Sequence, residues 1–236
     1  MKLSIIIPLY NEEKTINKLL SKVVLAKVPK SIKKEIIVIN DGSIDNSKLK
    51  IKSLKLRGAK KIYHENNLGK GAAIRSGLRI AKGDYVIIQD ADLEYDPNDY
   101  SKLLWPIIHN KALVVYGTRL INYPLRFWGK DKTVLPSHLL ANKFLTFLTN
   151  LLYGSELTDM ETGYKLIDAN ILKKIKFKSN RFDFEPEITA KILKLKIPIV
   201  EVPIDVKPRT YKEGKKISWK DGLIAIWTLI KYRIVD

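Results

Sequence analysis

Short apolar runs that alternate with longer amphipathic stretches constrain the fold of this chain more than any other feature. Each run has the length of a buried strand, and the stretches between them repeat apolar residues at helical spacing. Strands that alternate with helices form a mostly parallel sheet with helices on its faces, so the predicted class is α/β. The pattern predicts strands at residues 3–8, 35–40, 60–64, 85–89 and 113–117, and helices at residues 12–26, 45–56, 69–81 and 185–195.

Acidic side chains follow the strand predicted at residues 85–89. Asp90 and Asp92 leave the chain on the same side, because side chains two residues apart in an extended segment share a face, and Glu94 lies just beyond. In open α/β sheets, ligands bind at the carboxyl ends of the strands. Carboxylates that converge there suit a hard divalent cation, Mg²⁺ or Mn²⁺, shared with phosphate oxygens. The competing interpretation is an ordinary charged turn after a strand.

Two further strand ends carry polar residues that suit a nucleotide. After the first strand, Tyr10 offers a flat face for a base or ribose, and Glu12 offers an acceptor for ribose hydroxyls. After the second strand, Asp41 can accept a hydrogen bond from a base N–H, and Gly42 permits a tight turn. Each site alone is also consistent with turn and cap chemistry. Their position at the ends of successive strands favours a ligand site.

A glycine-rich turn at residues 67–71 opens the third predicted helix, and helix N-termini attract phosphate. Lys70 and Gly71 are therefore candidate phosphate contacts. The spacing is not that of a Walker A loop, and no G-x-G-x-x-G follows the first strand, which disfavours a dinucleotide-binding site.

The charge balance implies a polyanionic partner. The chain has 43 Lys+Arg against 25 Asp+Glu, a formal net charge of +18, and no cysteine, which excludes disulfides and thiolate chemistry. Nucleic acid, acidic lipid and phosphorylated substrates all fit this excess, but no nucleic-acid-binding motif is present. The longest apolar stretches are much shorter than the roughly 20 residues of a membrane span.

The second half of the chain suits a membrane surface. Residues 124–153 mix aromatic, aliphatic and basic side chains, and residues 217–235 predict an amphipathic helix with two tryptophans. Trp and Tyr favour the headgroup level, and Lys and Arg favour anionic lipid. Core packing or an oligomer contact is the alternative for both segments. Residues 159–165 are expected to form a polar loop, and residues 197–206 an edge strand, because Pro198 and Pro203 interrupt it.

The ordered set of motifs resembles family 2 glycosyltransferases of the GT-A fold, and within them the polyprenyl-phosphate branch that includes dolichyl-phosphate mannose and glucose synthases. The resemblance covers nearly the whole chain. Two departures are Asn40, where many members have aspartate, and the lack of the C-terminal membrane helices of several relatives. The motifs are SIIIPLYNE (4–12), NDGS (40–43), NLGKG (67–71), DAD (90–92), GTR (117–119), TDMETGYK (158–165), FEPE (184–187) and PRTYKEGKKI (208–217).

The resemblance implies a role for each matching position. Pro8, Tyr10, Glu12 and Asp41 would hold the nucleoside, and Arg119 would face a donor or acceptor phosphate. Arg209 and Lys215 would lie in a segment that closes over the nucleotide. Together the motifs predict the nucleotide-binding set Pro8, Tyr10, Asn11, Glu12, Asp41, Gly42, Lys70, Gly71, Asp90, Ala91, Arg209 and Lys215, the metal ligands Asp90, Asp92 and Glu94, and the catalytic residues Asp92, Asp159 and Arg119.

The acceptor decides whether a general base is needed. Asp159 matches the position at which relatives that act on sugar hydroxyls place a base. A phosphate monoester, whose second pKa is about 6, is already largely ionised at pH 7 and needs little help. Asp159 is therefore interpreted as a base, as a residue that orients the acceptor, or as a loop cap. Glu185 and Glu187 are either site residues or ordinary first-turn carboxylates.

The resulting hypothesis is a metal-dependent, inverting transfer of a hexose from a nucleotide sugar to a polyprenyl phosphate, with Mg²⁺ or Mn²⁺ as cofactor. UDP-glucose or another UDP-hexose is favoured over GDP-mannose. A saccharide-hydroxyl acceptor is the alternative, and nucleic-acid binding ranks last. Residues 1–210 are expected to form the catalytic domain, and residues 211–236 a lid and membrane-surface helix. The protein is expected at the cytoplasmic side of the membrane, as a peripheral protein without a transmembrane helix.

Overall fold

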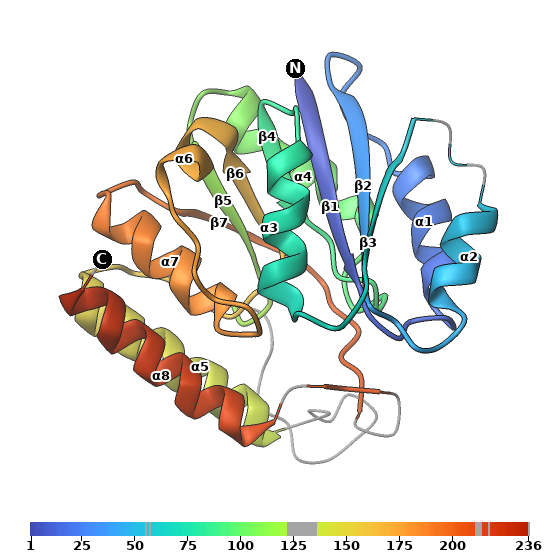
Figure 1. Cartoon of the computed structure of the whole chain (residues 1–236). Helices are drawn as coiled ribbons and strands as arrows, with labels where there is room; N and C mark the ends of the chain where they lie inside the picture. The colour runs from blue at the N-terminus through green and yellow to red at the C-terminus, as the bar shows by residue number, and fades with distance from the viewer. Residues whose placement is uncertain (55, 57, 122–135, 211–213, 217, 236) are drawn as a thin grey trace, which may run out of the picture.

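A mixed sheet runs through the molecule, with β1 (Lys2–Leu9) in its interior between β2 (Lys33–Asp41) and β4 (Tyr85–Ile88) (Figure 1). This computed structural model describes residues 1–236 apart from 55, 57, 122–135, 211–213, 217 and 236. Across the described residues the strand order is β3-β2-β1-β4-β6-β5-β7. The remaining strands are β3 (Lys60–His64), β5 (Val114–Thr118), β6 (Lys165–Asp168) and β7 (Val200–Pro203).

The pairing is mostly parallel, as the alternation of strands and helices predicts. β1 pairs in parallel with β2 and β4, β2 with β3, and β5 with β7. β6 is the exception, since it runs antiparallel to both β4 and β5. β6 was not predicted from the sequence, which indicated only a polar loop at residues 159–165. The edge position of β7 confirms the prediction, but the strand is shorter than residues 197–206 and Pro198 lies outside it.

Helices cover both faces of the sheet and create two apolar cores. One core packs α1 and α4 against the sheet, and the other packs α3, α6 and α7 against the opposite face (Figure 1). The predicted helices are confirmed, three of them with shorter ends and the fourth shifted by one residue, and Glu12 and Glu13 precede α1 rather than forming its first turn. The helices are α1 (Ile16–Leu25), α2 (Ser47–Ser53), α3 (Lys70–Ile80), η1 (Pro97–Asp99), α4 (Tyr100–Ile108), α5 (Pro136–Tyr153), α6 (Ala169–Lys174), α7 (Phe184–Lys194) and α8 (Trp219–Ile234).

Helices α5 and α8 lie side by side beyond α7 (Figure 1). A third apolar cluster joins them, with Leu145 of α5 and Ala225 and Leu229 of α8 buried in it. The Tyr153 hydroxyl donates to the Leu229 carbonyl at 2.7 Å. The C-terminal helix expected at residues 217–235 is therefore present, and its buried face packs on α5 and α7. Residues 124–135 of the predicted aromatic and basic stretch lie outside the described residues.

Lysines from the sheet cap the ends of the helices that surround it. Lys34 donates to the carbonyls of Val24 and Ala26 at 2.6 and 2.7 Å, at the end of α1. Lys61 donates to the Leu54 carbonyl at 2.8 Å after α2, and Lys60 to the Ile80 carbonyl at 2.8 Å at the end of α3. Cations at helix C-termini satisfy unpaired carbonyls and oppose the negative end of the dipole. Part of the basic excess is thus used to build the fold.

Glu35, at the amino edge of the sheet, should make stability depend on acid pH. Burial alone would raise its pKa, but hydrogen bonds from Lys60, Ser4, the Lys82 amide and Lys2 outweigh burial and hold the pKa at about 2. A carboxylate with a lowered pKa stabilises the fold above its unfolded pKa, and this contribution is lost as the pH falls from about 4.5 towards 2. Glu35→Gln should therefore cost on the order of 2 kcal/mol at pH 7.

Urea unfolding of both proteins at pH 7 and pH 3 measures this effect. The difference in free energy of unfolding should shrink at pH 3, because the wild-type carboxylate is by then losing its advantage. An equal difference at both pH values would show that the glutamate contributes by shape alone.

Candidate active site at the carboxyl edge of the sheet

The loops after β1, β2 and β4 meet at one edge of the sheet. Parallel register aligns Leu9 with Asn40, so residues 10–12 and 41–43 emerge side by side. The Asn11 amide donates to the Ser43 hydroxyl at 3.0 Å, and the Asn11 side chain accepts from the Ile44 amide at 2.9 Å. Asn11 adopts a positive φ of 49° to make this turn. Pro8 lies within β1, and Ala91 is buried against the core, so both shape the backbone of the site.

Arg209 brings its guanidinium into the acidic cluster that Glu12, Asp92 and Glu94 form. Its two terminal nitrogens donate to the two carboxylate oxygens of Glu12 at 3.1 Å each. The same group lies 3.3 Å from Asp92 and 3.6 Å from Glu94. Sequence reasoning placed all four residues in the site, but it gave no reason to expect Arg209 to pair with Glu12.

Lys70, at the start of α3, bridges two acidic residues. Its ammonium lies 2.7 Å from Asp90 and 2.7 Å from Glu185. Burial alone would lower the pKa of Lys70, but Asp90 and Glu185 outweigh burial and raise this pKa above its ordinary value. Glu185 is buried, and its second carboxylate oxygen has no hydrogen-bond partner among the described residues. Glu185 therefore lies beside the predicted site residues Lys70 and Asp90, and its own role in the site stays a prediction.

The turn before α3 is fixed by Asp41. The Asp41 carboxylate accepts hydrogen bonds from the amides of Leu68 and Gly69 at 3.0 and 2.8 Å, and from the Asn67 side chain at 3.1 Å. The His64 ring lies 2.7 Å from it on the other side. Both carboxylate oxygens of Asp41 therefore already accept hydrogen bonds from the protein. From the sequence, this carboxylate was expected to accept a hydrogen bond from a nucleobase. Its contact with a base remains a prediction.

The N-terminus of α3 also packs closely against the loop before α7. The Ala72 amide donates to the Asn180 carbonyl at 3.1 Å, so that helix donor does not face a phosphate. A Cβ at Gly71 would lie 2.5 Å from the Ser179 carbonyl oxygen, so no larger residue fits there. Glu187 holds the same loop by accepting from the Lys178 and Ser179 amides. Glu187 thus anchors this loop from the first turn of α7, and a direct role in the site stays a prediction.

Arg119 and Asp159 form a two-pronged ion pair. The Arg119 Nε and Nη2 donate to the two oxygens of Asp159 at 2.7 and 2.8 Å, and the Arg119 amide adds a third hydrogen bond at 2.9 Å. Asp159 is fully buried, with a relative exposure of 0%. Planar pairs of this kind fix the orientation of the guanidinium. Asp159 therefore holds Arg119 in one orientation, and a base role for Asp159 stays a prediction.

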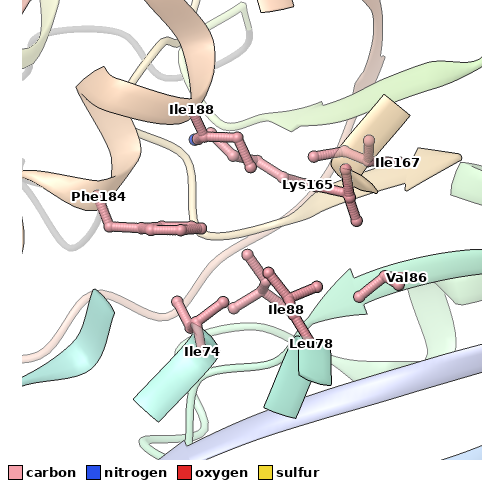
Figure 2. A pocket seen from close by; sticks show the side chains of 9 residues that line it. Ile74, Leu78, Val86, Ile88, Lys165, Ile167, Phe184 and Ile188 are labelled. Atoms are coloured by element: carbon pink, nitrogen blue, oxygen red, sulfur yellow. The ribbon is translucent and has the colours of Figure 1, made fainter. Parts of the chain in front are cut away.

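Two residues to which the sequence assigned no role support the loop that carries Asp159. Glu201 of β7 accepts from the amides of Thr158 and Asp159 at 2.7 and 3.0 Å. The buried Lys165 ammonium donates to the carbonyls of Met160 and Thr162 at 2.9 and 2.5 Å. Figure 2 shows Lys165 among the apolar side chains of α3, α7 and the sheet, where the packing leaves no room for a water molecule. Glu201 and Lys165 are thus structural supports of the site.

Tyr95 and Gly163 close the site on the side of Asp90. The Gly163 amide donates to the Tyr95 hydroxyl at 2.8 Å. A Cβ at Gly163 would lie 2.4 Å from the Asp90 carboxylate, so only glycine permits this approach. Tyr95 had not been predicted, and Gly163 stood in a quoted motif without a role, since the contact joins segments that are remote in sequence.

Lys216 also enters the predicted nucleoside region. Its ammonium donates to the Tyr10 carbonyl at 2.5 Å and to Glu12 at 2.9 Å, and lies 5.6 Å from the centre of the Tyr10 ring. For its neighbour Lys215, which sequence analysis had chosen, the structure gives a backbone hydrogen bond to Thr210. Lys216 thus contacts Glu12, and the predicted contact of Lys215 with a nucleotide stays a prediction.

The acidic residues suit a hard divalent cation in their chemistry. Burial raises the pKa of Asp92 to about 7, and repulsion from Asp90 and Glu94 adds to this rise. Carboxylates that crowd in this way gain from a cation between them, and oxygen ligands suit Mg²⁺ or Mn²⁺. Within the described parts of the chain, no three acidic or histidine side chains already stand in a metal-binding arrangement. Arg209 and Lys70 supply the positive charge instead.

Comparison with known proteins places this geometry in context. The sequence model described as glycosyl transferase family 2 matches residues 4–176. A UDP-N-acetylglucosamine–dolichyl-phosphate N-acetylglucosaminyltransferase of Methanococcus voltae is 31% identical, over 98% of this chain and 95% of its own. A dodecaprenyl-phosphate galacturonate synthase of Rhizobium johnstonii is 24% identical, over 82% of this chain and 55% of its own.

A solved structure shares the fold. Glucosyl-3-phosphoglycerate synthase from Mycobacterium tuberculosis, in complex with Mn²⁺, UDP and glucosyl-3-phosphoglycerate, superimposes with a TM-score of 0.73. The match covers 100% of this chain and 81% of that one, at 20% identity. At this identity the likeness supports the architecture of the sheet and its helices alone.

Proposed function

This chain belongs to glycosyl transferase family 2, and we propose that it transfers a hexose from a nucleotide sugar to a polyprenyl phosphate. The observation that carries the proposal is the buried pair of Arg119 and Asp159. The pair offers a fixed cation, and the Asp159 carboxylate is already bound to that cation, which suits an acceptor that is already ionised. The Methanococcus voltae and Rhizobium johnstonii relatives are named for polyprenyl-phosphate acceptors, which agrees with this choice.

We propose a uridine nucleotide as the donor, with UDP-glucose or another UDP-hexose favoured over GDP-mannose. The Methanococcus voltae relative is named for a UDP-sugar, and the structural neighbour was solved with UDP. Tyr10, Glu12 and Asp41 lie at the strand ends where a nucleoside would bind, and Lys216 lies beside Tyr10. Asp90, Asp92 and Glu94 would hold Mg²⁺ or Mn²⁺, which when bound offsets the charge that develops on the departing diphosphate.

The chemistry follows from the charges of the site. An oxygen of the acceptor phosphate attacks the anomeric carbon, and the bond from that carbon to the diphosphate oxygen breaks. The bonding electrons leave with the nucleoside diphosphate, and no proton is transferred in the step. Arg119 would hold the acceptor phosphate, and Arg209 and Lys216 would receive the leaving diphosphate. Attack opposite the leaving group inverts the anomeric centre.

Helices α5 and α8 supply a surface for the lipid. Within the described residues no helix is both long enough and apolar enough to cross a bilayer. Each of the two helices instead exposes an apolar stripe on the face away from its packing partners, with Lys143, Lys220, Lys231 and Arg233 also exposed. Aromatic and aliphatic side chains flanked by lysines suit the headgroup level of an anionic membrane. The stripes are Leu140, Phe144, Phe147 and Leu151 on α5, and Trp219, Leu223, Trp227 and Ile234 on α8.

Replacing both Trp219 and Trp227 by serine should weaken binding to vesicles of phosphatidylcholine and phosphatidylglycerol by at least about tenfold, since each buried aromatic ring contributes on the order of 2 kcal/mol. Co-sedimentation with vesicles measures the loss. Trp105→Ser is the matched control, because Trp105 is 50% exposed but lies on α4. An equal loss in the control, or a dimer in solution that the α8 changes dissolve, would contradict a membrane role.

The activity itself is tested by incubating the full chain with Mn²⁺, a polyprenyl phosphate and one nucleotide sugar at a time. We expect a lipid-linked sugar with a UDP-hexose, and nuclear magnetic resonance should show an inverted anomeric centre. Transfer to a saccharide hydroxyl but not to the lipid phosphate would favour the alternative acceptor. A folded protein that forms no glycosylated product with any donor would overturn the proposal.

A further inference from the structure

The guanidinium of Arg209 lies among the carboxylates of Glu12, Asp92 and Glu94, which would otherwise repel one another. Glu12 lies 197 residues before Arg209 in the sequence and Asp92 lies 117 residues before it, yet both lie within ion-pair distance of its guanidinium. The side chain of Arg209 is 16% exposed, and those of the three acids are between 8% and 19% exposed. Charges this sheltered from water interact strongly, so the guanidinium is the main counterion of the cluster.

The backbone delivers Arg209 to this position. The Lys207 amide donates to the Glu94 carbonyl at 3.0 Å, and the Arg209 amide donates to the Glu94 carboxylate at 3.2 Å. Val206, directly before Lys207, forms an antiparallel β-bridge with Tyr95, the residue after Glu94. The segment is therefore attached to the same loop that carries the predicted metal ligands.

The pairing is incomplete. The Arg209 Nε is buried and has no hydrogen-bond partner among the described residues, since the nearest Glu94 oxygen is 3.6 Å away. A buried donor without an acceptor is unfavourable. A ligand that offers more oxygen acceptors, such as a diphosphate, would satisfy the guanidinium better than the three carboxylates do.

Resting on the function proposed above, we propose that Arg209 is an internal counterion that a divalent metal must replace, and that the nucleotide makes this replacement possible. A bare metal ion would compete with a tethered guanidinium for Asp92 and Glu94. When the nucleoside diphosphate is present, its oxygens accept Arg209 and release the carboxylates for the metal. Metal and nucleotide then bind together, and each raises the affinity of the other by the same factor.

Lys216 provides the internal comparison. Its ammonium lies 2.9 Å from Glu12, but the structure gives it no contact with Asp92 or Glu94 within the described residues. Neutralising Lys216 removes one positive charge from the same region, as neutralising Arg209 does. In the Lys216 variant, however, the Arg209 guanidinium still lies beside the predicted metal ligands Asp92 and Glu94.

Titration of the full chain with Mn²⁺ alone, followed by electron paramagnetic resonance of the free ion, tests the exchange without any turnover. Arg209→Gln should bind Mn²⁺ about tenfold more tightly than the wild type, the size of a typical coupling between sites. Lys216→Gln should stay within about threefold of the wild type. Adding UDP should raise the Mn²⁺ affinity of the wild type about tenfold, and that of Arg209→Gln by less.

Two results would overturn the exchange. One is an equal affinity of the wild type and Arg209→Gln for Mn²⁺ in the absence of UDP. The other is a wild-type Mn²⁺ affinity that UDP does not change, a measurement that needs no variant and stands if Arg209→Gln fails to fold. In either case, continued binding of Mn²⁺ and UDP leaves the proposed function intact. Absence of Mn²⁺ binding from every protein, with or without UDP, would overturn the metal requirement as well.

Discussion

Arg119→Gln should lower kcat/KM for the polyprenyl phosphate by roughly two to three orders of magnitude, the usual cost of removing a preorganised group that stabilises charge in the transition state. The effect is expected to be large because Asp159 holds the guanidinium in one orientation through two side-chain hydrogen bonds. Radiolabelled transfer to the lipid, measured over a range of acceptor concentrations, separates the loss in kcat from the rise in KM.

The buried partner complicates the single variant. Removing Arg119 leaves the Asp159 charge uncompensated in a site with 0% exposure, which costs on the order of 3–5 kcal/mol of stability. The double variant Arg119→Gln with Asp159→Asn removes both charges and should recover most of that stability without recovering activity. Recovery of activity in the double variant would show that Arg119 acts only by neutralising Asp159.

Asp159→Asn alone distinguishes the two acceptor classes. If Asp159 orients Arg119, the asparagine keeps an oxygen for the guanidinium, and turnover should fall by only about tenfold, as for lost positioning. If the acceptor were a hydroxyl and Asp159 its base, turnover should fall by about 10⁴. The second result would overturn the lipid-phosphate proposal.

Asp92→Asn should lower the affinity for UDP in manganese buffer by at least about a hundredfold, because the metal would lose a charged ligand. The same change should leave the fold intact or stabilise it. The pKa of Asp92 is raised to about 7 by burial and by repulsion from Asp90 and Glu94, so its charge destabilises the native state at higher pH. Isothermal calorimetry measures the binding, and thermal unfolding measures the stability.

Glu156→Gln is the matched control for Asp92→Asn, since it removes one carboxylate from an exposed position outside the site. It should change neither UDP affinity nor metal uptake. Unchanged UDP affinity in Asp92→Asn, or a wild-type titration that shows no uptake of Mn²⁺, would defeat the interpretation of the acidic cluster as a metal site.

The sequence predicted those elements whose pattern is set locally. β1, β2 and β4 contain the short apolar runs that predicted them, and β3 (Lys60–His64) begins and ends where the pattern placed it. β6 has only four residues and begins with Lys165, which argues against a buried strand when read alone. It forms because β4 and β5 pair with it on both sides, and no local pattern reports such pairing.

The residues that meet at the carboxyl edge of the sheet were named from the sequence, but most of the contacts between them were not expected. Strand ends brought Asp41 and Asp90 to one edge, as parallel topology requires. The pairing of Arg209 with Glu12, and the approach of Gly163 to Asp90, depend on tertiary contacts between remote segments. Asp41 shows most clearly where prediction from sequence stops. An aspartate at this position suits a contact with a nucleobase, and it equally suits the hydrogen bonds that it accepts from the turn before α3.

The strand lysines that cap the C-terminal ends of helices affect how binding of this protein to lipid should be studied. Lys34, Lys60 and Lys61 contribute to the basic total, yet their ammonium groups are bound to main-chain carbonyls. Indiscriminate acetylation of the protein would fray those helix ends as well as reduce its attraction to acidic membranes, so a loss of vesicle binding after acetylation would report unfolding and electrostatics together. Charge-reversal experiments are best confined to Lys143, Lys220 and Lys231, which are exposed on α5 and α8.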